Sequence, residues 1–188
     1  DYTVISNAGD KFLVLTNDEA PRYRVIEIDL KNPARENWKT IVAEKKDVLK
    51  EAEVAGGKII GQYMKDATSQ MVIFNMDGSE LHSVALPAPG TLSGFEGNKD
   101  ENLAFYAFSS FTIPLTVYTY DIANNSSEVL HQPGIDFDGS GFESEQVFYT
   151  SKDGTKIPMF LVHKKGIKMD GNNPVYLYGY GGFNISLT

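Results

Sequence analysis

The residues best suited to chemistry lie near the C-terminus of this 188-residue chain, where an apolar run meets a glycine-rich turn. Val175 to Tyr178 has the pattern of a buried strand, and three of the next four residues are glycine. Glycines after a strand let the backbone approach a ligand closely and direct its N–H groups outward. Such N–H groups can stabilise the oxyanion that forms during acyl transfer. The local pattern leaves a second interpretation open, in which the aromatic residues beside these glycines only pack the end of a sheet.

Acyl transfer also needs a nucleophile and a base, and the sequence supplies neither in a recognisable pattern. A serine on a nucleophile elbow would lie in a G-x-S-x-G motif after a strand, and no such motif occurs. Gly139-Ser140-Gly141 comes closest, in a segment that we predict to be a linker. A catalytic role for His163 beside Ser151 would require a carboxylate partner and triad geometry. We therefore expect all three histidines, His82, His131 and His163, to be structural or surface residues.

We expect neither a cofactor nor a metal ion. The chain has no cysteine, which excludes disulfides and thiolate ligands. Asp136-Phe137-Asp138-Gly139 has a faint likeness to a calcium loop, but the other ligand positions and the bidentate Glu of an EF-hand are missing. A linker composition is the better account of this segment.

Charge and hydropathy restrict the partners and the compartment. The net charge of −8 argues against nucleic acid and against an anionic membrane surface as partners. No apolar run approaches the ~20 residues that a spanning helix needs. The first residues lack the basic and apolar regions of a signal peptide. We expect a cytoplasmic protein, with the periplasm as the alternative.

Strand patterns dominate the chain and repeat. Aromatic residues, which favour strands, make up 12% of the sequence. Short apolar runs form three similar units, each with a strand that ends on an aspartate, and Asp29, Asp77 and Asp121 lie 48 and 44 residues apart. A period of ~40–50 residues with several strands per unit indicates propeller blades. A β-sandwich with irregular hairpins is the alternative. The predicted strands are 1–6, 11–16, 23–30, 38–44, 57–64, 70–76, 81–86, 103–108, 115–122 and 127–131.

Only residues 44–54 have a helix-favouring composition, and there we predict a loop or a single turn. Residues 132–145 are rich in Gly, Asp and Ser and show no strand pattern, which marks a domain boundary. We place the domains at 1–136 and 137–188. In the second domain, 146–150 and 156–163 predict a β-hairpin, with Pro158 at an edge or bulge. The buried strand at 175–178 would follow it.

Three segments of the second domain carry a resemblance to a known family. The runs Val147 to Phe160, Val162 to Ile167 and Leu177 to Ser186 resemble prolyl oligopeptidase (prolyl endopeptidase), and residues 4–7 and 47–49 look like its later propeller blades. Members of this family are serine peptidases in which a seven-bladed β-propeller caps an α/β-hydrolase domain. The resemblance implies an internal fragment with a mainly β fold. It would comprise about three four-stranded antiparallel blades, followed by the opening strands of the hydrolase domain.

The resemblance also assigns roles to single residues. Tyr180 matches the residue whose phenol donates a hydrogen bond to the oxyanion, an interaction worth about 3–4 kcal/mol. Phe183 matches an aromatic residue of the proline-binding S1 pocket, and Gly181 and Gly182 would shape the turn. The catalytic Ser, Asp and His of the family have no match in these residues.

Two functions follow as expectations. In the first, the chain is a fragment of a serine endopeptidase that hydrolyses short peptides on the carboxyl side of proline. The fragment would be inactive alone, and its partners would be proline-containing peptides and the remainder of its own polypeptide. The alternative is a non-catalytic β-propeller binding module.

Overall fold

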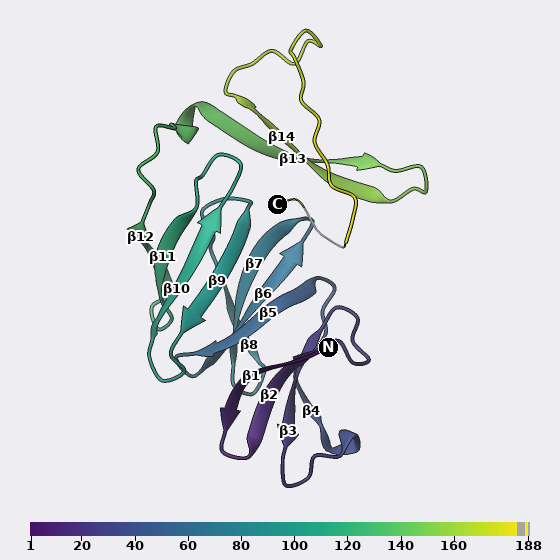
Figure 1. The fold of residues 1–188 in the computed structure, drawn as a ribbon, viewed down its shortest axis with the longest axis vertical. Helices are drawn as coiled ribbons and strands as arrows, with labels where there is room; N and C mark the ends of the chain where they lie inside the picture. The colour runs from purple at the N-terminus through teal and green to yellow at the C-terminus, as the bar shows by residue number, and fades with distance from the viewer. Residues whose placement is uncertain (184–186, 188) are drawn as a thin grey trace.

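The chain forms four antiparallel β-sheets (Figure 1). The computed structural model describes residues 1–183 and 187. Three of the sheets have four strands each, and the fourth is a two-stranded hairpin. The helices of the described residues are two short 3-10 helices, η1 (Arg35–Asn37) and η2 (Gly139–Gly141). None of them is long and apolar enough to cross a membrane.

Each four-stranded sheet is a meander in which consecutive strands pair, as the repeat predicted. β5 contacts both β1 and β9, so the first strands of the three sheets are neighbours, as the innermost strands of propeller blades are. The structure confirms a mainly β fold of four-stranded antiparallel sheets in a propeller-like row. The strands are β1 (Tyr2–Ala8), β2 (Lys11–Thr16), β3 (Arg24–Asp29) and β4 (Lys39–Val42) in the first sheet, β5 (Val48–Ala55), β6 (Lys58–Lys65), β7 (Thr68–Asn75) and β8 (Glu80–Val84) in the second, β9 (Thr91–Gly97), β10 (Leu103–Ser109), β11 (Thr116–Asp121) and β12 (Ser126–His131) in the third, and β13 (Phe142–Thr150) and β14 (Lys156–Lys164) in the hairpin.

The repeating aspartates have a structural reason. Asp29 and Asp121 end the third strands of their sheets, and Asp77 lies just after the third strand of its sheet. Each carboxylate accepts a hydrogen bond from a backbone N–H two or three residues later. The Oδ1 atoms of Asp29 and Asp77 lie 2.9 Å from the N atoms of Lys31 and Ser79. Asp121 makes the equivalent contact at 3.0 Å. The same turn chemistry therefore closes all three sheets.

The second sheet is buried on both faces because it lies between the other two. Ile59 and Phe74 belong to the cluster shared with the first sheet, whereas Ile60 and Ile73 belong to the cluster shared with the third. None of these four side chains is more than 2% exposed. Successive side chains of a strand point to opposite faces, so neighbouring residues enter different clusters.

Our prediction for residues 44–54 was wrong, because most of them form β5. Leu49, Ala52 and Val54 are buried in the core, while the charged residues between them are exposed. The pairing of β5 with β6 shifts register between Leu49 and Glu51. A bulge of this kind interrupts strict alternation, which is why the segment lacks the pattern of a strand.

The other strands differ less from expectation. We predicted no strand at β9, where Gly94 in a positive-φ conformation breaks the alternation. β13 begins at Phe142 rather than at residue 146. The hairpin predicted after the linker is confirmed, and its strands pair without a shift from Phe142 opposite Lys164 to Thr150 opposite Lys156.

The strand predicted at 175–178 does not form in this chain. Val175, Tyr176 and Leu177 are more than 80% exposed and lie in an extended segment without strand pairing. An apolar run forms a buried strand only where neighbouring strands supply hydrogen bonds and other layers cover both faces. Among the described residues, no strand pairs with this segment and no layer covers it.

The hairpin is attached to the blades at two places. The side-chain amide of Gln146 on β13 donates a hydrogen bond to the backbone carbonyl of Asp66, in the turn between β6 and β7. The rings of Phe160 on β14 and Phe111, which follows β10, are 5.2 Å apart. Figure 1 shows the hairpin across one end of the second and third sheets. The hairpin therefore bridges two blades while remaining outside their core.

Candidate active site

The two residues predicted to contact substrate lie on the extended segment that follows the hairpin. Tyr180 is 46% exposed and Phe183 is 90% exposed. Phe183 has a φ of 53°, in the left-handed region. A Cβ on Gly182 would lie 3.7 Å from the ring of Tyr180, so this ring packs beside the glycine. The two residues are three positions apart in the sequence, and both side chains are exposed in the structure.

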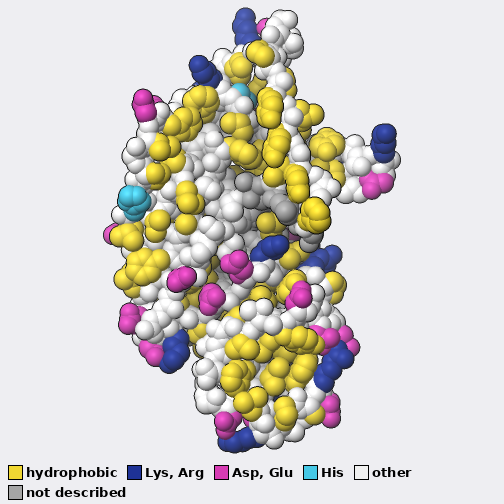
Figure 2. Space-filling view, viewed as in Figure 1, with side chains coloured by type: hydrophobic (Ala, Val, Ile, Leu, Met, Phe, Trp, Pro, Cys, Tyr) yellow, Lys and Arg dark blue, Asp and Glu magenta, His cyan; other side chains and the backbone are white. Residues whose placement is uncertain are grey.

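No hydrogen bond joins the phenol of Tyr180 to another described residue, and the side chain is 46% exposed. A phenolic O–H is a sound donor toward a developing negative charge. The predicted turn extends into residues 184–186, which lie outside the described part of the chain. Hydrophobic side chains gather along this extended segment and over the hairpin (Figure 2). The described residues of this surface therefore offer phenol donors and aromatic contacts.

The histidines do not form a triad. The ring of His82 lies 3.3 Å from the hydroxyl of Tyr120, which donates to Asn125 at 3.0 Å. Burial raises the pKa of Tyr120 to about 12, so this hydroxyl stays protonated at neutral pH. His131 is exposed on β12.

His163 does have a carboxylate partner, because its Nδ1 lies 3.5 Å from Oε1 of Glu143. Ser151, however, is in the turn at the opposite end of the hairpin, eight residues beyond Glu143, the strand partner of His163. At about 3.3 Å per residue the separation is roughly 26 Å. The pairing of His163 with Ser151 as base and nucleophile is therefore absent from this structure.

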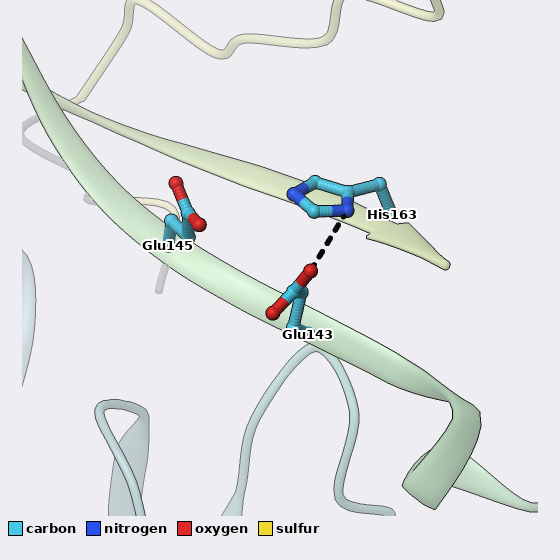
Figure 3. Close-up of side chains that lie close together, drawn as sticks. All are labelled: Glu143, Glu145 and His163. Atoms are coloured by element: carbon cyan, nitrogen blue, oxygen red, sulfur yellow. Dashed lines mark ion pairs between the residues drawn. The ribbon is translucent and has the colours of Figure 1, made fainter. Parts of the chain in front are cut away.

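Glu145 joins Glu143 and His163 in a cluster that our sequence analysis missed (Figure 3). Each residue offers one potential ligand atom, a ring nitrogen or a carboxylate oxygen, and these three atoms all lie within 4.8 Å of one another. The residues come from both strands of the hairpin, where Glu143 is directly opposite His163. The signal was present in the sequence, because extending the predicted hairpin by three residue pairs beyond residue 146 brings these residues together.

The linker between the blades and the hairpin lines an open cavity of about 380 Å³. Gly139 lies so close to the carbonyl oxygen of Thr112 that a Cβ would be 2.0 Å from it. Asp138 caps η2, and the hydrogen bonds that it accepts from the Ser140 side chain and backbone lower its pKa. The segment with the faint calcium-loop likeness thus contains a capped turn, as a linker would.

Comparison with known proteins agrees with this architecture. The family profile described as "Prolyl oligopeptidase, N-terminal beta-propeller domain" matches residues 1–133. The prolyl endopeptidase of Elizabethkingia meningoseptica is 42% identical over 187 residues, which cover 100% of this chain and 26% of that protein. The dual function macrocyclase-peptidase POPB of Amanita bisporigera is 34% identical over 191 residues, covering 99% of this chain and 26% of that protein.

A solved structure from an analysis of two prolyl endopeptidases and their inter-domain dynamics is also similar. It has a TM-score of 0.89 and 42% sequence identity, and the match covers 99% of this chain and 28% of the solved chain. The present chain thus spans about a quarter of the length of the relatives that it matches. The profile match covers well over half of the chain, and the sheets have the expected topology. The chain belongs to the prolyl oligopeptidase family.

Proposed function

We propose that this chain is part of a serine endopeptidase that cleaves short peptides on the carboxyl side of proline. It would contribute later blades of the propeller and the opening of the hydrolase domain. One observation carries the proposal. Similarity to prolyl endopeptidases extends over 100% of the chain, past residue 133 where the propeller profile ends, and into the segment with Tyr180.

The division at residues 136 and 137 is part of this proposal. The third sheet ends at His131, the propeller profile ends at residue 133, and the hairpin begins at Phe142. Between them lies a connection without strands, which passes close to the β10–β11 loop at Gly139. A hairpin followed by an apolar run and a glycine-rich turn is consistent with the opening of an α/β-hydrolase sheet.

In this account Tyr180 stabilises the tetrahedral intermediate. As the nucleophile attacks, negative charge develops on the carbonyl oxygen of the scissile bond, and the phenol donates a hydrogen bond to it. The second donor would be the backbone N–H that follows the nucleophile, in the remainder of the polypeptide. The ring of Phe183 would pack against the pyrrolidine of proline. Its present exposure fits a residue whose pocket is completed by other parts of the protein.

The test uses the longer protein that contains this chain and a peptide substrate with one proline. We expect Tyr180→Phe to lower kcat by about 10²–10³-fold, because the lost donor acts mainly in the transition state, and to leave KM nearly unchanged. Tyr178→Phe is the matched control, since Tyr178 is a tyrosine of the same segment with no proposed role in the reaction, and we expect full activity. Equal activities for wild type and Tyr180→Phe would refute the proposed role.

The 188 residues alone should not hydrolyse the peptide, because they lack the catalytic Ser, Asp and His. Hydrolysis by the isolated chain would contradict this proposal. A longer protein that binds proline-containing peptides without cleaving them would favour the binding-module alternative. We further propose that the chain's main partner is the remainder of its own polypeptide. A cytoplasmic location, with the periplasm as the alternative, stays a prediction.

A further inference from the structure

The hairpin places three ligand-type side chains on one face at the end nearest the linker. Glu143 and Glu145 are two positions apart on β13, so their side chains point to the same side. His163 on β14 is the direct partner of Glu143, and it is a diagonal neighbour of Glu145, within reach of a long side chain. Figure 3 shows the imidazole and both carboxylates above the same stretch of β13.

The hydrogen bonding of His163 leaves one ring nitrogen free to bind a ligand. Its Nδ1 lies 3.0 Å from the backbone carbonyl oxygen of Lys164. A carbonyl oxygen can only accept, so Nδ1 carries the proton and Nε2 carries a lone pair. The side chain is only 12% exposed, and Nε2 is buried without a hydrogen-bond partner. In Figure 3 this atom points toward the side on which Glu145 lies.

This arrangement is the one that metal-binding histidines use. Such a residue almost always donates its other ring N–H to a carbonyl or carboxylate, which fixes the tautomer and the orientation of the ring. Lys164 supplies that carbonyl here. A buried lone pair without a donor is unfavourable in water-excluded surroundings, and a bound cation would satisfy it.

The charges of the cluster favour a cation as well. Glu143 and Glu145 are like charges on one face. Among the described residues, the contact with a basic side chain is that of Glu143 with His163, which is an ion pair only when the imidazole is protonated. No Lys or Arg of the described chain forms an ion pair with them. A neutral imidazole does not compensate two carboxylates, whereas a divalent cation does.

We propose that His163 Nε2 and the carboxylates of Glu143 and Glu145 form a binding site for a divalent first-row transition metal, with Zn²⁺ as the representative ion. Imidazole and carboxylate suit zinc, at about 2.0–2.2 Å from the metal. One ring nitrogen of His163 and one oxygen of each carboxylate already lie within 4.8 Å of one another. Glu143 now contacts Nδ1, so its side chain would have to rotate toward Nε2 to bind the same ion. Three protein ligands leave a fourth position for water. The site would join the strands of the hairpin where it leaves the linker, and it replaces our expectation that the chain has no metal site.

Isothermal titration of the EDTA-treated 188-residue chain with Zn²⁺, and separately with Mg²⁺, tests the proposal. We expect one Zn²⁺ per chain and much weaker binding of Mg²⁺, because the imidazole selects against Mg²⁺. His163→Asn and Glu145→Gln should each weaken Zn²⁺ binding at least about 10–100-fold, the loss seen when even outer-shell partners are removed. His131→Asn is the matched control, since it removes an exposed histidine on β12, and it should not change the affinity.

Nitrogen NMR of the histidine rings identifies the ligand atom. We expect Zn²⁺ to shift the Nε2 resonance of His163 while Nδ1 keeps its proton. A circular dichroism spectrum like that of wild type shows that each variant is folded, and Glu145→Gln, on an exposed side chain, is the substitution less able to disturb the fold.

Three results would overturn the proposal. They are Zn²⁺ binding no tighter than Mg²⁺, Zn²⁺ binding unchanged in both His163→Asn and Glu145→Gln, and a Zn²⁺-induced shift at Nδ1 instead of Nε2. The site does not depend on the proposed peptidase function. Loss of peptidase activity in Tyr180→Phe of the longer protein would leave the zinc result unaffected.

Discussion

The second sheet and the hairpin both contain strands rich in apolar residues, yet only the second sheet has a core. Ile73 and Phe74 on β7 are almost fully buried because sheets lie on both sides. Phe148 and Val162 in the hairpin are 48% and 45% exposed, because the described blades touch their face of the hairpin only at Gln146 and Phe160. The comparison teaches that an apolar pattern sets which face can be buried, whereas neighbouring elements decide whether it is buried.

The largest expected effect is on the free energy of unfolding, when an apolar side chain is truncated in the second sheet and, for comparison, in the hairpin. Phe74→Ala removes a buried ring from the contact between the first and second sheets and should lower the free energy of unfolding by about 3–5 kcal/mol. Val162→Ala in the hairpin should change it by less than about 0.5 kcal/mol. Urea unfolding followed by circular dichroism measures both. Similar losses for the two variants would mean that the hairpin shares the core of the blades.

Two turn glycines sharpen the comparison, since they have nearly the same backbone conformation. Gly78 has a φ of +86° and Gly154 a φ of +88°. A Cβ on Gly78 would lie 1.8 Å from the carbonyl oxygen of Ile41 on β4, whereas a Cβ on Gly154 would meet nothing within 4 Å.

Alanine at Gly154 therefore adds only the strain of the left-handed conformation, about 1–2 kcal/mol. Alanine at Gly78 adds the same strain and also displaces β4, so Gly78→Ala should destabilise the chain by more. Thermal unfolding of the two variants provides the test. A greater loss for Gly154→Ala would refute this account of how the turns pack.

A smaller effect concerns the attachment of the hairpin to the blades. Gln146→Ala removes the hydrogen bond to the carbonyl of Asp66, a loss of about 0.5–1.5 kcal/mol. We expect faster amide hydrogen exchange in β13 and β14, with little change in β6 and β7. Gln70→Ala, at an exposed position of β7, is the control and should leave exchange in the hairpin unchanged. Uniformly faster exchange in all sheets would show that hairpin and blades unfold together.

The smallest effect is the pH dependence of the stability that two aspartates in turns contribute. A hydrogen bond from the Ser79 side chain lowers the pKa of Asp77, and one from the Thr155 backbone lowers the pKa of Asp153. A lowered folded-state pKa gives stability that is present above the unfolded pKa and is lost as pH falls through the folded pKa.

Asp77→Asn should therefore reduce the acid sensitivity of global unfolding, because Asp77 closes a blade. Asp153→Asn should alter only local exchange in the hairpin turn. Unfolding midpoints measured between neutral and acidic pH check both variants. An equal effect of Asp153→Asn on global unfolding would contradict the separation of the two regions.

The sequence was sufficient to predict the structural features that depend on local chemistry. The three units, their turns at Asp29, Asp77 and Asp121, and the hairpin follow from alternation and turn residues alone. Neither β5 nor β9 was predicted as a strand, because a bulge interrupts the alternation of β5 and Gly94 interrupts that of β9. These two strands are fixed by pairing with neighbours, which a local pattern does not contain.

The candidate site was predictable only in part. The roles proposed for Tyr180 and Phe183 came from family resemblance, since nothing local distinguishes a donor tyrosine from one that packs a sheet. The cluster of Glu143, Glu145 and His163 depends on strand register across the hairpin, which sequence patterns fix only when both strand ends are known. The run at 175–178 has the pattern of a strand, but the neighbours that it would need are missing from the described residues.

Amide hydrogen exchange across residues 174–183, in this chain and in the longer protein, tests the central claim most directly. The account predicts fast exchange in the isolated chain, where these residues are unpaired, and strong protection in the longer protein, where they would enter the hydrolase sheet. The amides of β6 and β7 should be protected in both. Fast exchange of residues 174–183 in the longer protein as well would contradict the claim that the chain carries the opening of that domain.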